Sequence, residues 1–366
     1  MATTEDAVKT LQSKVYRLVK PYQIEETVVE RELRRGEVAV KPILGSICHA
    51  DLRYYTGNRR PEALAQKLPM ALIHEGIGEI VDSAAEEFAP GQKVVIIPNI
   101  PGDPSLDKAE REKRLNSPET LEDNYSEQGK FLASGTDGIA QSLLIMPALC
   151  VAPIPEGVPE EIAVLAELTS VSHQAIHRVK HRLPGAKVAV FGDGPVGYIT
   201  ASLLHYHFGL PTERLRVFGA VPEKLSAFDF AVTSNVNEYD FRSSEKVDLA
   251  IECTGGKFSS AAINQAIDVL RPGGGLVLLG VTEELVPINT RDILEKGITV
   301  LGSSRSSFRD YPPVLEAMKN PAFQEALRKL LPEERHEIRT AADFDEAMKQ
   351  TSETPRWKKT LLQFHW

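Results

Sequence analysis

The chain has 366 residues, which is long enough for two domains that each bury a core. Hydrophobic residues make up 42% and charged residues 25% of it, a composition that excludes a largely disordered chain. The formal net charge of -9 and the scattered Lys and Arg residues argue against a nucleic-acid partner, and no apolar run suits a membrane span.

The amino-terminal end and the cysteines indicate the compartment. Residues 1–10 are polar and mixed in charge, without the pattern of an export signal. The three cysteines, Cys48, Cys150 and Cys253, are too few and of the wrong number for a disulfide framework. We therefore expect a protein of the reducing cytoplasm.

Short apolar runs separated by Gly and Pro fill the first part of the chain, up to about residue 154. Examples are residues 37–41, 77–81 and 93–97. Closely spaced strands of this kind predict an antiparallel, barrel-like β domain. The pattern stops at residues 98–130, which we interpret as a polar surface excursion with room for one short helix.

Strands and helices alternate in the second part of the chain. We expect strands at residues 187–191, 215–218, 247–251, 275–279 and 299–301, and helices at 196–208 and 259–270. Such alternation predicts an α/β fold with a doubly wound parallel sheet.

The tail has its own pattern of elements. It should form a helix, a strand at 337–339, a helix at 341–350 and a strand at 360–364, and these can complete the first domain. The predicted division is therefore a catalytic domain at 1–160, a dinucleotide-binding domain at 161–310 and a carboxyl-terminal part at 311–366.

A glycine-rich turn lies between the first strand and the first helix of the second part; its residues are Gly192, Asp193, Gly194, Pro195, Val196 and Gly197. Gly192 can make the tight turn, Gly194 lets the backbone approach a pyrophosphate, and Gly197 allows close packing of helix on sheet. A turn that merely links strand to helix is the alternative. The ordered strand, turn, helix and second strand favour a dinucleotide site.

The residues after the second strand bear on the choice of dinucleotide. Gly219 and Ala220 stand where an acid would bind the ribose hydroxyls, so no carboxylate there would repel a 2′-phosphate. Lys224 or Arg216 could provide the countercharge. NADPH is therefore favoured over NADH. The alternative is that Glu223 reaches the ribose and Lys224 is only a solvated charge.

Residues with metal-binding side chains precede this turn. Cys48 is followed by Asp51, then by His74 and Glu75, and Glu167 lies on the helix that leads into the second part. Each of them alone would more often be a buried or solvated side chain. Together, thiolate, imidazole and carboxylate suit a catalytic Zn²⁺ with one position open for a substrate oxygen. Asp51 would then accept a hydrogen bond from His74 and orient it.

The order of these residues resembles the zinc-type medium-chain alcohol and polyol dehydrogenases over essentially the whole chain. The resemblance implies a GroES-like β-barrel catalytic domain, built from both chain ends, plus a Rossmann domain. It implies Cys48, His74 and Glu167 as zinc ligands, with Glu75 beside the metal.

Two departures from that family change the expectations. Residues 98–130 lack the four cysteines of a structural zinc, so we expect one zinc per chain and no structural zinc. Ala50 stands where many members carry a Ser or Thr proton relay, which leaves the proton route open.

Longer segments narrow the resemblance to the ribulose-5-phosphate reductases that make ribitol 5-phosphate for teichoic acid and CDP-ribitol synthesis. These segments are residues 46–57, 66–70, 72–76, 281 and 302–306. The resemblance implies NADPH-dependent reduction of D-ribulose 5-phosphate. We also expect a homodimer and functional coupling to the cytidylyltransferase that makes CDP-ribitol.

A phosphorylated substrate needs cations near the metal residues. Arg53, Arg59 and Lys67 lie in the flanking segments and are the candidates, with Arg305 and Arg309 as second choices. Each could equally be a surface charge.

Two other functions stay open at this point. One is an NAD(P)-dependent polyol or sugar dehydrogenase that acts on an unphosphorylated substrate. The other is a non-catalytic NADPH-binding sensor, which the missing relay at Ala50 would suit and the intact metal residues argue against.

Overall fold

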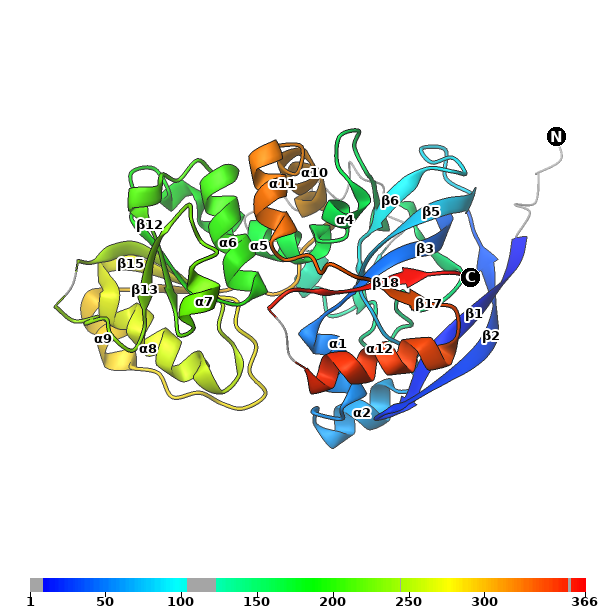
Figure 1. The fold of residues 1–366 in the computed structure, drawn as a ribbon, viewed down its shortest axis with the longest axis horizontal. Coiled ribbons are helices and arrows are strands. Elements are labelled where there is room, and N and C mark those ends of the chain that lie inside the picture. Colours follow the sequence, from blue (N-terminus) through cyan, green and yellow to red (C-terminus); the bar gives the residue numbers. More distant parts are fainter. Residues whose placement is uncertain (1–8, 104–122, 244, 355–356) are drawn as a thin grey trace. The chain divides into compact units, whose positions relative to one another are not determined.

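The computed structural model describes residues 9–103, 123–243, 245–354 and 357–366. The chain forms two compact units (Figure 1), of which the first comprises residues 1–167, 306–316 and 331–366 and the second comprises residues 168–305 and 317–330. The short helix expected in the polar excursion would fall on residues 104–122, which lie outside the described residues.

The boundaries of the units differ from the predicted ones in three places. The first boundary follows Glu167 rather than residue 160, and the second follows Arg305 rather than residue 310. Residues 317–330, which the sequence assigns to the first domain, belong to the second unit.

Packing explains the third difference. Residues 317–330 contain helix α11 (Pro321–Arg328), whose Phe323 side chain is fully buried. The carbonyl of Ala326 in this helix accepts a 3.0 Å hydrogen bond from the hydroxyl of Tyr198 in α6 (Pro195–Tyr206). An amphipathic pattern shows that a helix buries one face, but not against which partner.

The first unit is a largely antiparallel β structure, as the sequence predicts. Its larger sheet runs in the order β10-β6-β5-β3-β18-β17, with β9 also paired to β3. The bounds are β3 (Glu37–Ile47), β5 (Glu75–Ser83), β6 (Lys93–Ile96), β9 (Leu144–Pro147), β10 (Val151–Pro153), β17 (His336–Ile338) and β18 (Thr360–Phe364). Because β18 pairs with β3, with Thr360 opposite Ile47, both ends of the chain contribute to one sheet.

Smaller elements complete the first unit. A second sheet has the order β2-β1-β4, and β7 pairs with β8. Their bounds are β1 (Lys9–Lys20), β2 (Gln23–Leu33), β4 (Met70–Ala71), β7 (Asn99–Ile100) and β8 (Lys130–Phe131). The helices are α1 (His49–Tyr55), α2 (Pro61–Lys67), α4 (Glu160–Ala163), α10 (Tyr311–Ala317) and α12 (Ala341–Glu353), the last of which packs against β2 and β17 (Figure 1).

The second unit contains a six-stranded parallel sheet in the order β13-β12-β11-β14-β15-β16. The bounds are β11 (Val188–Phe191), β12 (Leu215–Gly219), β13 (Val232–Asn235), β14 (Val247–Glu252), β15 (Leu270–Leu278) and β16 (Thr299–Gly302). Strand β13 is not predicted from the sequence, because its residues are polar and only partly buried. Strands β11, β12, β14 and β16 lie within one residue of their predicted bounds, whereas β15 begins at Leu270, earlier than the predicted start at residue 275.

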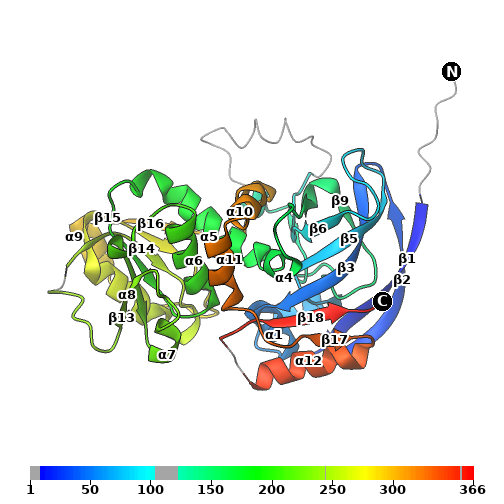
Figure 2. The same cartoon turned by 45° about the horizontal axis from the view of Figure 1, so that its top comes forward.

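Helices cover both faces of this sheet. They are α5 (Ala166–Val179), which begins in the first unit, and α6, α7 (Pro222–Leu225), α8 (Ser259–Val269), α9 (Thr290–Lys296) and α11. Figure 2 shows α6 and α8 on opposite faces. The strand order reverses between β11 and β14, and ligands of such sheets bind at the carboxyl ends of the strands at this point.

Among the described residues, no helix is both long enough and apolar enough to cross a membrane.

Candidate metal centre and cofactor site

Asp51 holds together the two segments that carry the metal-binding side chains. Cys48 caps α1, and its backbone N–H donates to Oδ2 of Asp51 at 3.0 Å. The other carboxylate oxygen, Oδ1, accepts from the N–H of Ile73 at 3.0 Å and lies 3.3 Å from Nδ1 of His74. Ile73 has a φ of 71°, a strained conformation for a β-branched residue, directly before His74.

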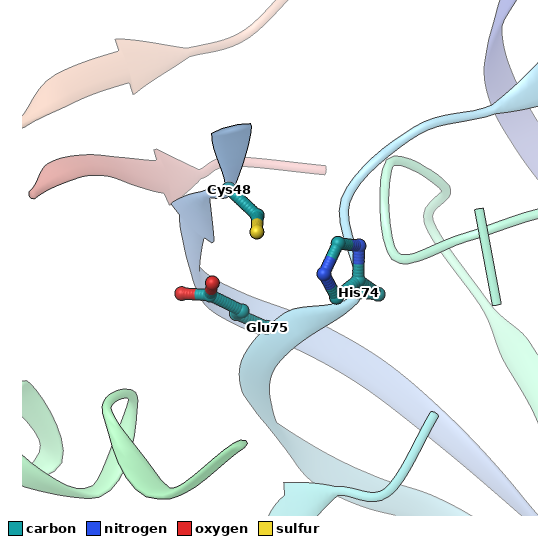
Figure 3. Close-up of side chains that lie close together, drawn as sticks. All are labelled: Cys48, His74 and Glu75. Carbon is teal, nitrogen blue, oxygen red and sulfur yellow. The ribbon is translucent and has the colours of Figure 1, made fainter. Parts of the chain in front are cut away.

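Cys48, His74 and Glu75 gather at one point of the first unit. Their ligand atoms all lie within 4.8 Å of one another, and Figure 3 shows the thiol, the ring and the carboxylate directed at a common space. His74 and Glu75 are buried. With Nδ1 of His74 turned toward Asp51, Nε2 is available on the side of Cys48.

The charges of this group favour a cation. Burial by itself would lower the pKa of His74, but the negative charges of Asp51 and Cys48 raise that pKa well above its usual value. A bound metal ion would take the place of the proton in such an environment.

Glu167 and Lys359 lie next to the three residues. Glu167 is buried, and burial raises its pKa to about 7, with the charge of His74 acting in the opposite direction. Lys359, just before β18, donates to Oε1 of Glu75 at 2.9 Å and is itself buried. Glu167 is not among the residues whose ligand atoms lie within 4.8 Å of one another. Of the predicted ligands, the structure thus brings Cys48 and His74 together with Glu75, and Glu167 lies beside them.

Lys359 is a site residue that is not predicted from the sequence. It is separated by 284 residues from its partner Glu75 and follows another lysine in a polar stretch, so no local pattern marks it. The ion pair neutralises the charge of Glu75, which would otherwise repel the carboxylate of Glu167.

These residues fit Zn²⁺. Thiolate, imidazole and carboxylate are its usual protein ligands, and ligand atoms within 4.8 Å of one another need only a small approach to lie about 2.0–2.3 Å from one ion. Oε2 of Glu75 lies 2.9 Å from the Lys359 ammonium but is buried without a hydrogen bond. A cation would satisfy this oxygen.

The glycine-rich turn of the second unit has the geometry of a dinucleotide site. Gly192 has a φ of +129°, which favours glycine, and a Cβ on Gly197 would lie 2.0 Å from the carbonyl oxygen of Gly192. A Cβ on Gly194 would meet nothing within 4 Å, so open space remains where a pyrophosphate would approach. Helix α6 then begins with Pro195 and Val196. Its N-terminus suits the phosphate charge.

The end of β12 differs from the expectation. Gly219 is the buried last residue of the strand, and a Cβ there would come within 2.7 Å of Asp193. Gly219 is therefore required for the close packing of Asp193 against this strand end. The exposed position is the next one, Ala220.

An acid does stand at this strand end, and it comes from the glycine-rich turn. Oδ2 of Asp193 accepts the N–H groups of Ala220 at 2.8 Å and Val221 at 2.9 Å. Lys224 lies 3.9 Å from Oδ1 of the same carboxylate, whereas Arg216 donates to Ser234 at 2.7 Å. Lys224 therefore lies at this strand end beside the Asp193 carboxylate, and its role as countercharge to a 2′-phosphate stays a prediction. The expectation that no carboxylate lies here was wrong.

Two of the three candidate phosphate ligands lie together, and the third, Arg53, has other surroundings. Arg59 and Lys67 both lie over the ring of Tyr54. Arg53 instead acts on His49, whose pKa is lowered first by burial and then by the charges of Arg53 and Lys359.

Two family models match the chain. "Zinc-binding dehydrogenase" matches residues 226–320, and "Alcohol dehydrogenase GroES-like domain" matches residues 34–156.

Characterised relatives match nearly the whole length. Ribulose-5-phosphate reductase 1 of Staphylococcus aureus is 38% identical over 359 residues, which cover 96% of this chain and 99% of the relative. Ribulose-5-phosphate reductase of Bacillus spizizenii is 34% identical over 355 residues, with coverage of 96% and 99%. The crystal structure of S. aureus TarJ in complex with NADPH is similar with a TM-score of 0.81 and 34% identity, covering 97% of this chain and 100% of that one.

Proposed function

The chain belongs to the ribulose-5-phosphate reductase family of zinc-binding dehydrogenases, and on that premise we propose that it reduces D-ribulose 5-phosphate to D-ribitol 5-phosphate with NADPH. The proposal rests on the group Cys48, His74 and Glu75, in a chain that matches these reductases over 96% of its length. Hydride passes from the nicotinamide to the C2 carbonyl carbon, and the carbonyl oxygen takes up a proton to become a hydroxyl.

We assign one zinc per chain to Cys48, His74 and a carboxylate of the pair Glu75 and Glu167. Bound Zn²⁺ supplies Lewis-acid polarisation of the substrate carbonyl. Asp51 orients His74, and three protein ligands leave a position for the substrate oxygen.

NADPH binding is assigned to the second unit. The backbone of Gly192, Gly194, Pro195, Val196 and Gly197 faces the pyrophosphate, in the turn and the first residues of α6. Lys224 is the cation near the ribose that would bear the 2′-phosphate.

A second copy of the chain is the expected macromolecular partner. Strand β16 is one edge of the parallel sheet, and within the described residues it pairs only with β15, with Val300 exposed. Leu285 and Leu294 are exposed in the segment that leads to this strand. Light scattering should give the mass of a dimer. Leu285→Glu should shift the equilibrium toward the monomer, because a charge would then have to be buried in the dimer contact. The protomer itself should be unaffected, since Leu285 is exposed in it.

We further propose that the reductase works in the cytoplasm and that its product passes to a cytidylyltransferase that makes CDP-ribitol for teichoic acid. The three cysteines all lie among the described residues and form no disulfide, which suits a reducing compartment. A coupled assay with such an enzyme and CTP tests the second step by the appearance of CDP-ribitol.

The deciding experiment is NADPH oxidation by the zinc-loaded protein with ribulose 5-phosphate. The same assay with ribulose, with neutral ketoses and with NADH completes the comparison. Faster turnover of an unphosphorylated substrate would favour a polyol dehydrogenase. Zinc-loaded protein without turnover on any of these substrates would favour a sensor.

A further inference from the structure

Lys67, the last residue of α2, holds two hydroxyl groups together in the first unit. Its ammonium donates to the hydroxyl of Tyr54 at 3.0 Å and to that of Ser134 at 2.9 Å. The two hydroxyl oxygens are 3.4 Å apart. The three polar groups come from three separate segments and meet at one point.

The positive charge at this point is not neutralised by Lys67's neighbours. Within the described residues, no carboxylate lies within 4.0 Å of the Lys67 ammonium, and both of its hydrogen-bond partners are neutral. A second cation adjoins it, because the Arg59 guanidinium carbon lies 4.6 Å from the centre of the Tyr54 ring. A partly buried ammonium without a carboxylate beside it, as at Lys67, favours an anion as neighbour.

The positive charge lowers the pKa of the Tyr54 phenol. Burial would raise the pKa of its phenol, but the hydrogen bonds from Lys67 and Ser134 and the charges of Lys67 and Arg59 lower it. The surroundings of this hydroxyl therefore stabilise negative charge.

The distance between the metal-binding residues and the Tyr54 hydroxyl suits the length of the proposed substrate. Tyr54 follows Cys48 by six residues, and a helix advances about 9 Å over that span. Asp51, which contacts His74, lies one helical turn before Tyr54. A ribulose 5-phosphate chain spans roughly 6 Å from C2 to phosphorus when extended, to which a metal–oxygen bond adds about 2 Å.

A second chain segment makes the same connection. The ring of Phe131 lies 5.4 Å from that of His74, and Ser134 follows three residues later in a tight turn, where its N–H donates to the carbonyl of Phe131 at 3.1 Å. The metal group and the hydroxyl pair are thus joined by two short pieces of backbone.

Building on the proposed function, we propose that the substrate phosphate binds to Lys67, Arg59 and the hydroxyls of Tyr54 and Ser134. A phosphate monoester carries nearly two negative charges at neutral pH and has three acceptor oxygens, which matches two cations and two hydroxyl donors. Arg53, whose charge acts on His49, is not assigned to this site.

The test compares phosphorylated and unphosphorylated substrates with the zinc-loaded enzyme. Lys67→Met should lower kcat/KM for ribulose 5-phosphate about tenfold to a hundredfold, the range expected for a lost charge-assisted contact. Tyr54→Phe and Ser134→Ala should lower it about threefold to tenfold. With ribulose as substrate, each variant should stay within about twofold of the wild type.

Two further variants serve as matched controls. Lys67→Arg keeps the charge and should recover most of the activity with ribulose 5-phosphate. Lys41→Met removes an exposed lysine of β3 and should behave as the wild type. An equal loss with both substrates, or no loss at Lys67, would overturn the proposed site.

Binding of inorganic phosphate separates this proposal from the proposed reaction. Calorimetry should detect phosphate binding to the wild type and a loss of binding in Lys67→Met, whatever the carbonyl substrate is. If the wild type reduces ribulose 5-phosphate but the variants affect ribulose 5-phosphate and ribulose equally, the function stands and the site is wrong. If the wild type binds phosphate through Lys67 but does not reduce this substrate, the site stands and the function is wrong.

Discussion

Cys48 contributes to the protein through the metal rather than through packing. Its side chain is only partly buried, and the turn that carries it is held by backbone contacts to Asp51. Cys48→Ser should therefore lower the zinc content and reduce kcat/KM by about a thousandfold or more, since Lewis-acid stabilisation contributes several kcal/mol. The unfolding midpoint should change little.

Metal analysis and activity on the same samples check this prediction. Cys253→Ser is the matched control, because this thiol lies in the second unit and should leave the zinc content at one per chain. A Cys48→Ser protein that retained full zinc and activity would rule out the ligand assignment.

Cofactor choice should respond at Ala220 rather than at Gly219. A side chain at Gly219 would collide with Asp193, whereas Ala220 is exposed at the end of β12. Ala220→Asp should lower kcat/KM for NADPH relative to NADH by about tenfold, because a second carboxylate would join Asp193 near the 2′-phosphate.

The ratio of kcat/KM for the two cofactors measures this effect. Ala220→Asn has nearly the same size without the charge and should keep most of the wild-type ratio. A ratio that did not move in Ala220→Asp would mean that the 2′-phosphate lies away from this strand end.

At the scale of elements, one carboxylate connects the small sheet to the segment that carries Ser134. Asp137 accepts hydrogen bonds from Arg17 in β1 at 3.0 and 2.6 Å, from Arg31 in β2 at 2.7 Å and from the N–H of Ala71 in β4 at 2.9 Å. Three strands are thereby joined to one loop.

These contacts make stability depend on pH. Burial would raise the pKa of Asp137, but the bonds from Arg17 and Ala71 and the arginine charges lower it below the usual value. A lowered carboxyl pKa in the folded state stabilises the fold above about pH 4, and this stability is lost as pH falls through the lowered pKa. Asp137→Asn should cost about 2 kcal/mol at pH 7, a value discounted for the partly exposed arginines.

Urea unfolding at pH 7 and near pH 3 tests the prediction. The difference between wild type and Asp137→Asn should shrink at the lower pH. Glu32→Gln removes a surface partner of Arg34 and should leave the free energy of unfolding nearly unchanged at either pH. An undiminished difference for Asp137→Asn at low pH would show that its charge is not the cause.

At the scale of the whole molecule, the metal residues and the glycine-rich turn belong to different units. Removing zinc with a chelator should therefore abolish reduction while the affinity for NADPH changes by less than about twofold, as for independent sites. Fluorescence titration with NADPH before and after chelation measures this. Loss of NADPH binding on chelation, with recovery on adding zinc, would instead show that the two sites are coupled.

The sequence by itself determined the features that depend on neighbouring residues. Five strands of the parallel sheet and the roles of Gly192, Gly194 and Gly197 follow from apolar runs and from the sterics of a turn between strand and helix. Cys48, His74 and Glu75 could be recognised because few other functions need a thiol, an imidazole and a carboxylate in this order.

Only the tertiary structure decided which distant side chains meet. Lys359 reaches Glu75 across 284 residues, Asp193 occupies the end of β12, and Lys67 joins Tyr54 to Ser134. The unit to which α11 belongs was settled in the same way, by its packing on Tyr198. A charge, a hydroxyl or an amphipathic helix shows locally that it needs a partner, but the identity of the partner depends on how the whole chain packs.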